Sequence, residues 1–153
     1  MNTDTAATIA VLLSVVLVAH DLGDQWVQTH TQACGKGRAG WVGRRACAAH
    51  VATYTALTAG VIGLLWASLH LPISPTGFLA GQLVSAVSHY WADRRTPLMR
   101  IAQAIGKGDY YHLGQPRPGR DDNLTTGTGA YALDQAWHRT WLVVAMWLTA
   151  VIR

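Results

Sequence analysis

Glutamate is absent from this sequence of 153 residues, so all eight of its acidic residues are aspartates. Charged residues of both signs are scarce: they make up 13% of the chain, whereas hydrophobic residues make up 50%. An average soluble domain carries about 25% charged residues. The shortage of charge is therefore typical of a membrane protein. Several aspartates nevertheless lie inside apolar stretches, where a soluble protein rarely places them.

Cysteine is also rare, since Cys34 and Cys47 are the only two. They are too few for a disulfide framework and lack the C-x-x-C spacing of a zinc site, so we expect reduced, structural thiols. The formal net charge is +4, but the basic residues cluster between apolar segments without interleaved aromatic residues. This pattern predicts no nucleic-acid partner. No serine or cysteine nucleophile motif and no internal repeat is present.

Four apolar segments have the length of about 17 to 25 residues that spans a bilayer as a helix. They predict an all-α, polytopic integral membrane protein, with one domain over residues 1–153 and four transmembrane helices in a compact bundle. Gly77, Gly81 and Ser85 share one face of the third segment and predict close helix packing there. The first segment has no basic n-region and no small-residue cleavage pattern, so we interpret it as retained rather than as a signal peptide. The predicted spans are residues 5–27, 46–71, 76–93 and 129–152.

The basic residues predict the orientation. Ten of the twelve lysines and arginines lie in two connections, four between the first two segments and six between the last two. By the positive-inside rule these connections, including loop 94–128, are cytoplasmic, and both termini lie outside a bacterial cytoplasmic membrane. Within the loop, residues 96–114 predict a short interfacial helix. Residues 115–129 form a Pro/Gly/Asp-rich stretch that is either a lid over a pocket or a simple tether.

Histidine and aspartate recur four residues apart inside the apolar segments, a spacing that puts both side chains on one helical face. His50 follows Arg45 by five residues and His89 precedes Arg94 by five, so each lies about 7 to 8 Å inside the cytoplasmic edge. The same estimate puts the histidines of the first and fourth segments at this level. Four histidines from four helices are therefore predicted to meet: the pairs are His20 with Asp24, His89 with Asp93 and Asp134 with His138, joined by His50.

An ionised aspartate at the centre of a membrane helix costs about 2.5 to 3.5 kcal/mol, so these carboxylates need a compensating charge. A divalent cation satisfies carboxylate and imidazole lone pairs together. The pattern predicts one or two zinc, manganese or iron ions. The alternative without a metal is hydrogen bonding between helices, which stabilises the protein by about 0.6 to 2 kcal/mol per pair. The candidate ligands are His20, Asp24, His50, His89, Asp93, Asp134 and His138, and their candidate hydrogen-bond partners are Gln25, Gln28, Tyr54 and Gln135.

The motifs HDLGDQWVQ, HVATY, HYWAD and DQAWH, in this order, resemble a family of small membrane proteins from bacteria, plasmids and phages that is classed as a domain of unknown function. Its pattern covers almost the whole chain, and the stretch LGQPRPGRDDNLTTGTGAYALDQAWH looks like its actinobacterial branch. The family is distantly similar to membrane-bound metal-dependent hydrolases, which implies the same seven ligand positions. Many members have a lysine shortly after H-x3-D, where this chain has Arg94 and Arg95.

These observations favour a metal-dependent hydrolase that acts at the cytoplasmic leaflet on a lipid-linked phosphoryl or ester substrate. Asp21 and Asp24 are the candidate catalytic residues, with Asp21 free to carry the proton. Arg94, Arg95 and Arg139 are candidates to hold an anionic lipid head group, or are simply topology determinants. One alternative is a non-catalytic phage or plasmid accessory protein, holin-like or an exclusion factor, with a structural metal. Another is a haem-binding redox protein, and a homo-oligomer stays open in each case.

Overall fold

A computed structural model of the chain describes residues 3–115 and 127–152, and the described residues form helices without any strand. This confirms the all-α prediction. Arg117, Arg120 and most of the predicted lid or tether lie outside the described residues. The elements are α1 (Thr3–Leu22), the π-helical turn η1 (Gly23–Val27), α2 (His30–Gly35), α3 (Gly40–Leu69), α4 (Pro75–Asp93), α5 (Thr96–Ala104), α6 (Gly108–Tyr111) and α7 (Thr128–Val151).

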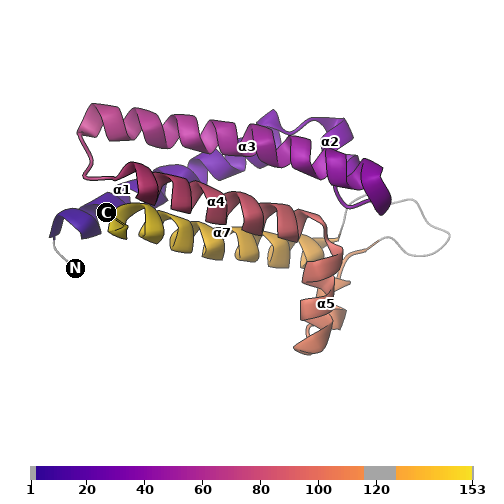
Figure 1. Cartoon of the computed structure of the whole chain (residues 1–153). Coiled ribbons are helices and arrows are strands. Elements are labelled where there is room, and N and C mark those ends of the chain that lie inside the picture. The colour runs from indigo at the N-terminus through magenta and orange to yellow at the C-terminus, as the bar shows by residue number, and fades with distance from the viewer. Residues whose placement is uncertain (1–2, 116–126, 153) are drawn as a thin grey trace.

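The four long helices α1, α3, α4 and α7 run alongside one another (Figure 1). Helix α1 contacts α3 and α7, and α4 contacts the same two, so the contacts form a closed ring. The start of α1 and the end of α7 lie at one end, and η1, α2 and α5 lie at the other (Figure 1). The chain therefore passes back and forth along one axis.

Helices α4 and α7 pack closely because α4 carries glycine on the shared face. A Cβ atom added at Gly81 would lie 2.7 Å from the carbonyl oxygen of Ala145, closer than real Cβ contacts. Helix α4 begins at Pro75, a favoured first position, and the Ser74 hydroxyl accepts a hydrogen bond from the Gly77 backbone N–H at 2.9 Å. The predicted close approach along this glycine face is confirmed.

Two predicted boundaries need correction. The second segment was expected to begin at residue 46, but α3 begins at Gly40, so Arg44 and Arg45 lie on the helix rather than in a connection. The first segment was expected to be one uninterrupted helix over 5–27, but its last turn, η1, widens into a π-helical turn. An apolar stretch predicts the part of a helix that lies in apolar surroundings. It does not predict the residue at which the backbone hydrogen bonds of the helix begin.

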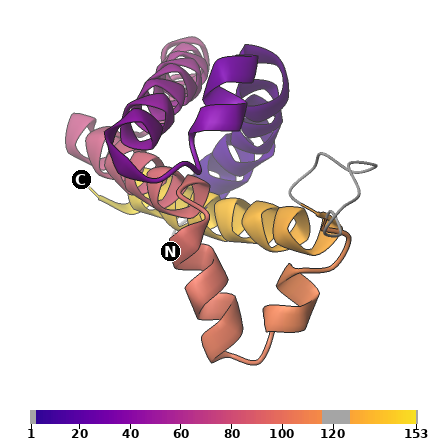
Figure 2. The same cartoon turned by 90° about the vertical axis from the view of Figure 1, so that its right-hand side faces the viewer.

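The predicted helix over residues 96–114 is divided into α5 and α6. The chain turns between them at Gly106, which has a φ of +75°, a conformation that glycine adopts without strain. Both short helices project away from the four long helices (Figure 2). Leu98 and Ala102 of α5 and Tyr111 of α6 form a small apolar cluster with Ala130 of α7, and this cluster fixes the pair beside the start of α7.

The two ends of the four long helices differ in what they bury. The apolar end contains the main hydrophobic core, which includes Leu12, Ile62, Leu142 and Met146. The polar end, near η1 and α2, contains His20, His50, His89 and His138, all of them buried. Successive long helices run in opposite directions. In each of them, the residues on one side of the histidine lie toward the apolar end and those on the other side lie toward the polar end.

Two of the described segments are long and apolar enough to cross a membrane: Thr3–Val27, which comprises α1 and η1, and α3. Four spans were predicted. Among the described helices α4 and α7 do not reach the same apolar content, since α4 buries Gln82, Ser85, Ser88, His89 and Asp93 along one side. The all-helical architecture with two candidate spans is the part of the membrane prediction that the structure bears out.

Candidate metal centre

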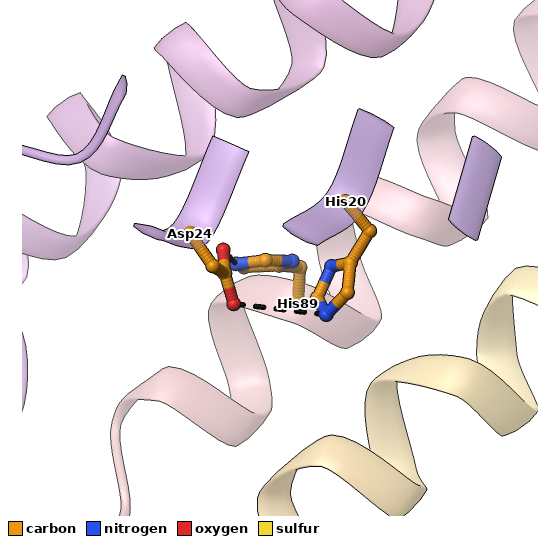
Figure 3. A group of neighbouring side chains, drawn as sticks. All are labelled: His20, Asp24 and His89. Atoms are coloured by element: carbon orange, nitrogen blue, oxygen red, sulfur yellow. Dashed lines mark ion pairs between the residues drawn. The ribbon is translucent and has the colours of Figure 1, made fainter. Parts of the chain in front are cut away.

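All seven predicted ligands belong to groups of histidine and aspartate whose ligand atoms lie within 4.8 Å of one another. Figure 3 shows one group, in which His20 and Asp24 from the end of the first helical segment point toward His89 of α4. The predicted meeting of four helices therefore occurs in the fold. These buried groups could hold a metal ion; they are His20–Asp24–His89, His50–His89–Asp93 and Asp93–Asp134–His138.

Four atoms at the centre lie close to one another, and we call them the tetrahedral set after the geometry that zinc prefers with four ligands. The Nε2 atoms of His50 and His89 are 3.0 Å apart, and each lies 3.3 Å from Asp24 Oδ1. Each also lies 3.3 Å from Asp93 Oδ2. Zinc bonds of 2.0 to 2.2 Å to nitrogen and oxygen imply ligand-to-ligand edges of about 3.3 to 3.5 Å in a tetrahedron. The four histidine-to-aspartate distances match this length, and the distance between the two histidine nitrogens is slightly shorter.

Apart from the contact between Nε2 of His50 and Nε2 of His89, several ligand atoms of the centre lack hydrogen-bond partners. Asp93 is 1% exposed and His138 is 2% exposed. Oδ2 of Asp93, Oδ1 of Asp24 and Nε2 of His138 are buried without a hydrogen bond. An unsatisfied buried polar group costs about 1 to 3 kcal/mol, and more when it is charged. A divalent cation coordinates such lone pairs directly, so the donor set fits a metal.

Asp24 owes its position to the π-helical turn. The residues before it form a regular α-helix, and η1 then widens the helix so that Asp24 turns toward α3 and α4. Gly23, the first residue of the turn, lets the ring of Tyr54 approach, because a Cβ atom there would lie 2.9 Å from that ring. Single π-helical turns within α-helices occur frequently at functional sites. No periodic pattern in the sequence predicts this turn.

The four predicted hydrogen-bond partners are divided between two roles. The Nε2–H group of His20 donates to Gln135 Oε1 at 3.3 Å, and Nε2 lies 3.7 Å from Asp24 Oδ2. The Tyr54 ring packs on that of His89 at a centroid distance of 4.0 Å, and its hydroxyl pairs with Ser85 at 3.3 Å. Gln25 and Gln28 instead line the cavity beside the centre. With His20 engaged in this way, the tetrahedral set is completed without it.

Lys36 is the residue that sequence reasoning missed. Its Nζ atom lies 2.8 Å from Asp93 Oδ1, and its side chain is 12% exposed. In the sequence it stands in the connection CGKGR, where its charge served only to predict orientation. Nothing in the spacing of motifs connects residue 36 with residue 93. The contact depends on how α2 packs against α3 and on the hydrogen bonds that Arg94 and Arg95 donate to the chain around α2.

The predicted catalytic and head-group residues fall in different places. Asp21 is exposed and belongs to none of the three groups. Arg139 is exposed on α7. Arg94 donates hydrogen bonds to the backbone carbonyl oxygens of Lys36 and Arg38, and Arg95 donates to that of Ala33. The two adjacent arginines therefore hold the connection around α2 against the end of α4.

A cavity of about 200 Å³ opens beside the centre. It reaches two of the tetrahedral ligands, Asp24 and Asp93. Burial raises the pKa of the Tyr111 hydroxyl in its wall, which keeps that group protonated as a donor. The cavity is thus a polar chamber next to the ligands; its lining includes Asp24, Gln25, Gln28, Lys36, Asp93, Arg95, Tyr111, Tyr131, Asp134 and Gln135.

The remaining histidines and the cysteines lie apart from the centre. His30, His70 and His112 are exposed. Both cysteines are free thiols; Cys34 is exposed, and Cys47 is buried with its thiol 3.6 Å from the carbonyl oxygen of Tyr90. The structure therefore concentrates its buried metal-ligating groups, within the described residues, in one region.

Comparisons with protein-family models, with curated proteins and with solved structures found no match for the chain. The resemblance to small membrane proteins of unknown function and to membrane-bound hydrolases stays a prediction. A functional assignment depends on the residues and geometry of this chain alone.

Proposed function

We propose that the chain is an integral membrane protein with four spans in a compact bundle, and that it binds a divalent metal ion and acts as a metal-dependent hydrolase at the cytoplasmic leaflet. The observation that carries the proposal is the buried convergence of ligand atoms from His50, His89, Asp24 and Asp93 within 3.0 to 3.3 Å of one another across each histidine contact. A transition metal such as zinc, manganese or iron matches these nitrogen and oxygen donors.

The outer surface supports the membrane placement. Only 33% of the most apolar window of Thr3–Val27 and 28% of that of α3 is buried, whereas a core helix of a soluble protein is mostly buried. Helix α4 exposes Leu79, Leu83 and Val87, which recur every four residues and form an apolar stripe facing outward. An apolar exterior around a polar interior is what a lipid environment favours. We therefore include α4 and α7 among the proposed spans.

The basic residues support the orientation. Arg44 and Arg45 at the start of α3, and Arg94 and Arg95 after α4, all belong to the polar end. Under the positive-inside rule this end faces the cytoplasm. Helices α5 and α6 project from the same end and are placed to lie along the membrane interface.

The cavity beside the centre supports hydrolysis. A divalent ion bound there would supply Lewis acidity and a nucleophile at neutral pH. Asp134 lines the cavity and is 24% exposed, so it is better placed than the exposed Asp21 to accept a proton. Lys36 and Arg95 line the same wall and would bind an anionic oxygen, as in a lipid-linked phosphoryl or ester substrate.

One observation favours a second candidate, a structural metal in a non-catalytic accessory protein. Four protein ligands close a tetrahedron, and closed four-ligand zinc sites are typically structural. The haem alternative fits less well, because a 3.0 Å separation between Nε2 of His50 and of His89 leaves no space for a porphyrin between them. Holin-like or exclusion activity is a form of the structural role and gains no separate support.

Metal analysis of protein purified in detergent without chelators tests the metal. We expect about one equivalent of transition metal per chain, loss of it in His50→Ala, and retention in the exposed-histidine control His70→Ala, since a closed ligand set retains its ion. Wild-type protein without metal would refute the proposal.

Cobalt substitution then separates the two candidate functions. Inorganic phosphate should change the visible spectrum of the Co²⁺ form if the ion has an exchangeable position, which supports the hydrolase. A spectrum that phosphate leaves unchanged supports the structural role. The probe needs no knowledge of the natural substrate.

A further inference from the structure

Lys36 places a fixed positive charge inside the metal centre. Its ammonium group lies 2.8 Å from Asp93 Oδ1, while Asp93 Oδ2 faces His50 and His89 at 3.3 Å. The two oxygens of the Asp93 carboxylate therefore face different groups. One belongs to the tetrahedral set, and the other belongs to the lysine.

The surroundings of Lys36 hold it in place. Lys36 caps the C-terminus of α2, and Arg94 binds its backbone carbonyl oxygen and that of Arg38. Arg95 adopts a φ of +59°, a conformation costly for a residue with a side chain, and from there its guanidinium donates to Ala33. The Arg95 side chain also packs against Gly37, where a Cβ atom would lie 2.7 Å away. The lysine is thus anchored on both sides.

Asp93 Oδ1 is also part of a second set of ligand atoms. It lies 3.8 Å from His138 Nε2, which in turn lies 3.5 Å from Asp134 Oδ2. His138 is 2% exposed, and its Nε2 atom has no hydrogen-bond partner. Three donors that converge in this way form a second cation position, next to the tetrahedral one and joined to it by Asp93.

We propose that the ammonium group of Lys36 takes the place of a second metal ion at the position formed by Asp93, Asp134 and His138. The chain then binds one divalent transition metal ion, and removal of the lysine side chain opens a second site for the same class of ion. This inference rests on the proposed function, because it presumes that the tetrahedral position binds a metal.

Charge balance supports the assignment. The cavity lining contains three carboxylates, Asp24, Asp93 and Asp134, and two basic residues, Lys36 and Arg95. One divalent ion changes the net charge of this lining from −1 to +1, which suits an anionic substrate, whereas two ions together with Lys36 would leave +3. Like charges so close together repel strongly in a region of low dielectric constant. The lysine and a second ion are therefore mutually exclusive.

The number of bound metal ions tests the proposal. Purified protein in detergent is saturated with Zn²⁺, desalted and analysed for zinc per chain. We expect one ion in wild type, two in Lys36→Met and one in Lys107→Met. The last variant is a matched control, because Lys36 and Lys107 are the only lysines in the chain and Lys107 is exposed. The double variant Lys36→Met/His138→Ala should return to one ion.

Two ions in wild type, or one ion in a folded Lys36→Met variant, would overturn the inference while leaving the proposed function intact. No ion in wild type would overturn both. His138→Ala in the wild-type background provides a measurement that does not depend on the folding of a Lys36 variant. It should keep one ion, since His138 is outside the tetrahedral set, and loss of that ion would refute the separation of the two positions.

Discussion

The apolar and polar ends of the molecule are built from the same four long helices, but they bury different kinds of side chain. At the apolar end, Leu12, Ile62, Leu142 and Met146 bury their side chains against one another and leave no polar atom in need of a partner. At the polar end, Asp93 and His138 are buried as completely, yet carry atoms without hydrogen bonds. The apolar side chains need no further partner, whereas the buried groups of the polar end could hold a metal ion.

The difference shows that burial alone does not distinguish packing from function. The helices approach one another at the apolar end because glycine on α4 admits the backbone of α7. That approach also brings the histidines of α4 and α7 together, with ring centroids 4.1 Å apart. A close-packed apolar end therefore provides the rigid frame on which the ligands of the polar end are positioned.

Metal removal should give the largest difference between the two ends. A ligand present at about a thousand times its dissociation constant stabilises the folded state by about 4 kcal/mol, so a chelator should lower the free energy of unfolding by at least that amount. Unfolding in detergent, followed by tryptophan fluorescence, measures the change. The variant His50→Ala/His89→Ala should not respond to chelator, and an unchanged wild-type unfolding curve would contradict the expectation.

A change at the apolar end should be smaller and should leave the metal in place. Gly81→Ala pushes a methyl group toward the Ala145 carbonyl oxygen and should cost about 1 to 3 kcal/mol of unfolding free energy, with metal content unchanged. The matched control is Gly60→Ala on α3, where a Cβ atom would meet nothing within 4 Å. It should stabilise the protein by about 0.4 to 1 kcal/mol. Equal effects of the two substitutions would refute the role of the glycine face.

The smallest effect is expected where the two ends meet. Tyr54→Phe removes only the hydroxyl that pairs with Ser85 and keeps the ring against His89. Hydrogen bonds between membrane helices average about 0.6 kcal/mol, so the unfolding free energy should fall by about that amount while one metal ion stays bound. Loss of metal in Tyr54→Phe would show instead that the hydroxyl belongs to the centre.

Local pattern accounts for much of the fold. The four apolar segments correspond to α1 with η1, α3, α4 and α7, with one start misplaced by six residues at Gly40. The seven candidate ligands were predicted because a four-residue spacing places His89 and Asp93, for example, on one helical face, and that geometry is set within a single helix. Basic residues in the connections predicted the cytoplasmic edge, and the distance from that edge predicted the depth at which the histidines of different helices could meet.

The sequence by itself determined the helical segments, the faces that bear histidine and aspartate, and their common level, because helical periodicity and the exclusion of charge from apolar surroundings act over a few residues at a time. Only the tertiary structure decided which ligand atoms meet, that η1 turns Asp24 inward, and that Lys36 reaches Asp93 across 57 positions of the chain. Contacts of that kind depend on how α2 packs against α3 and is held near the end of α4, which no local pattern contains.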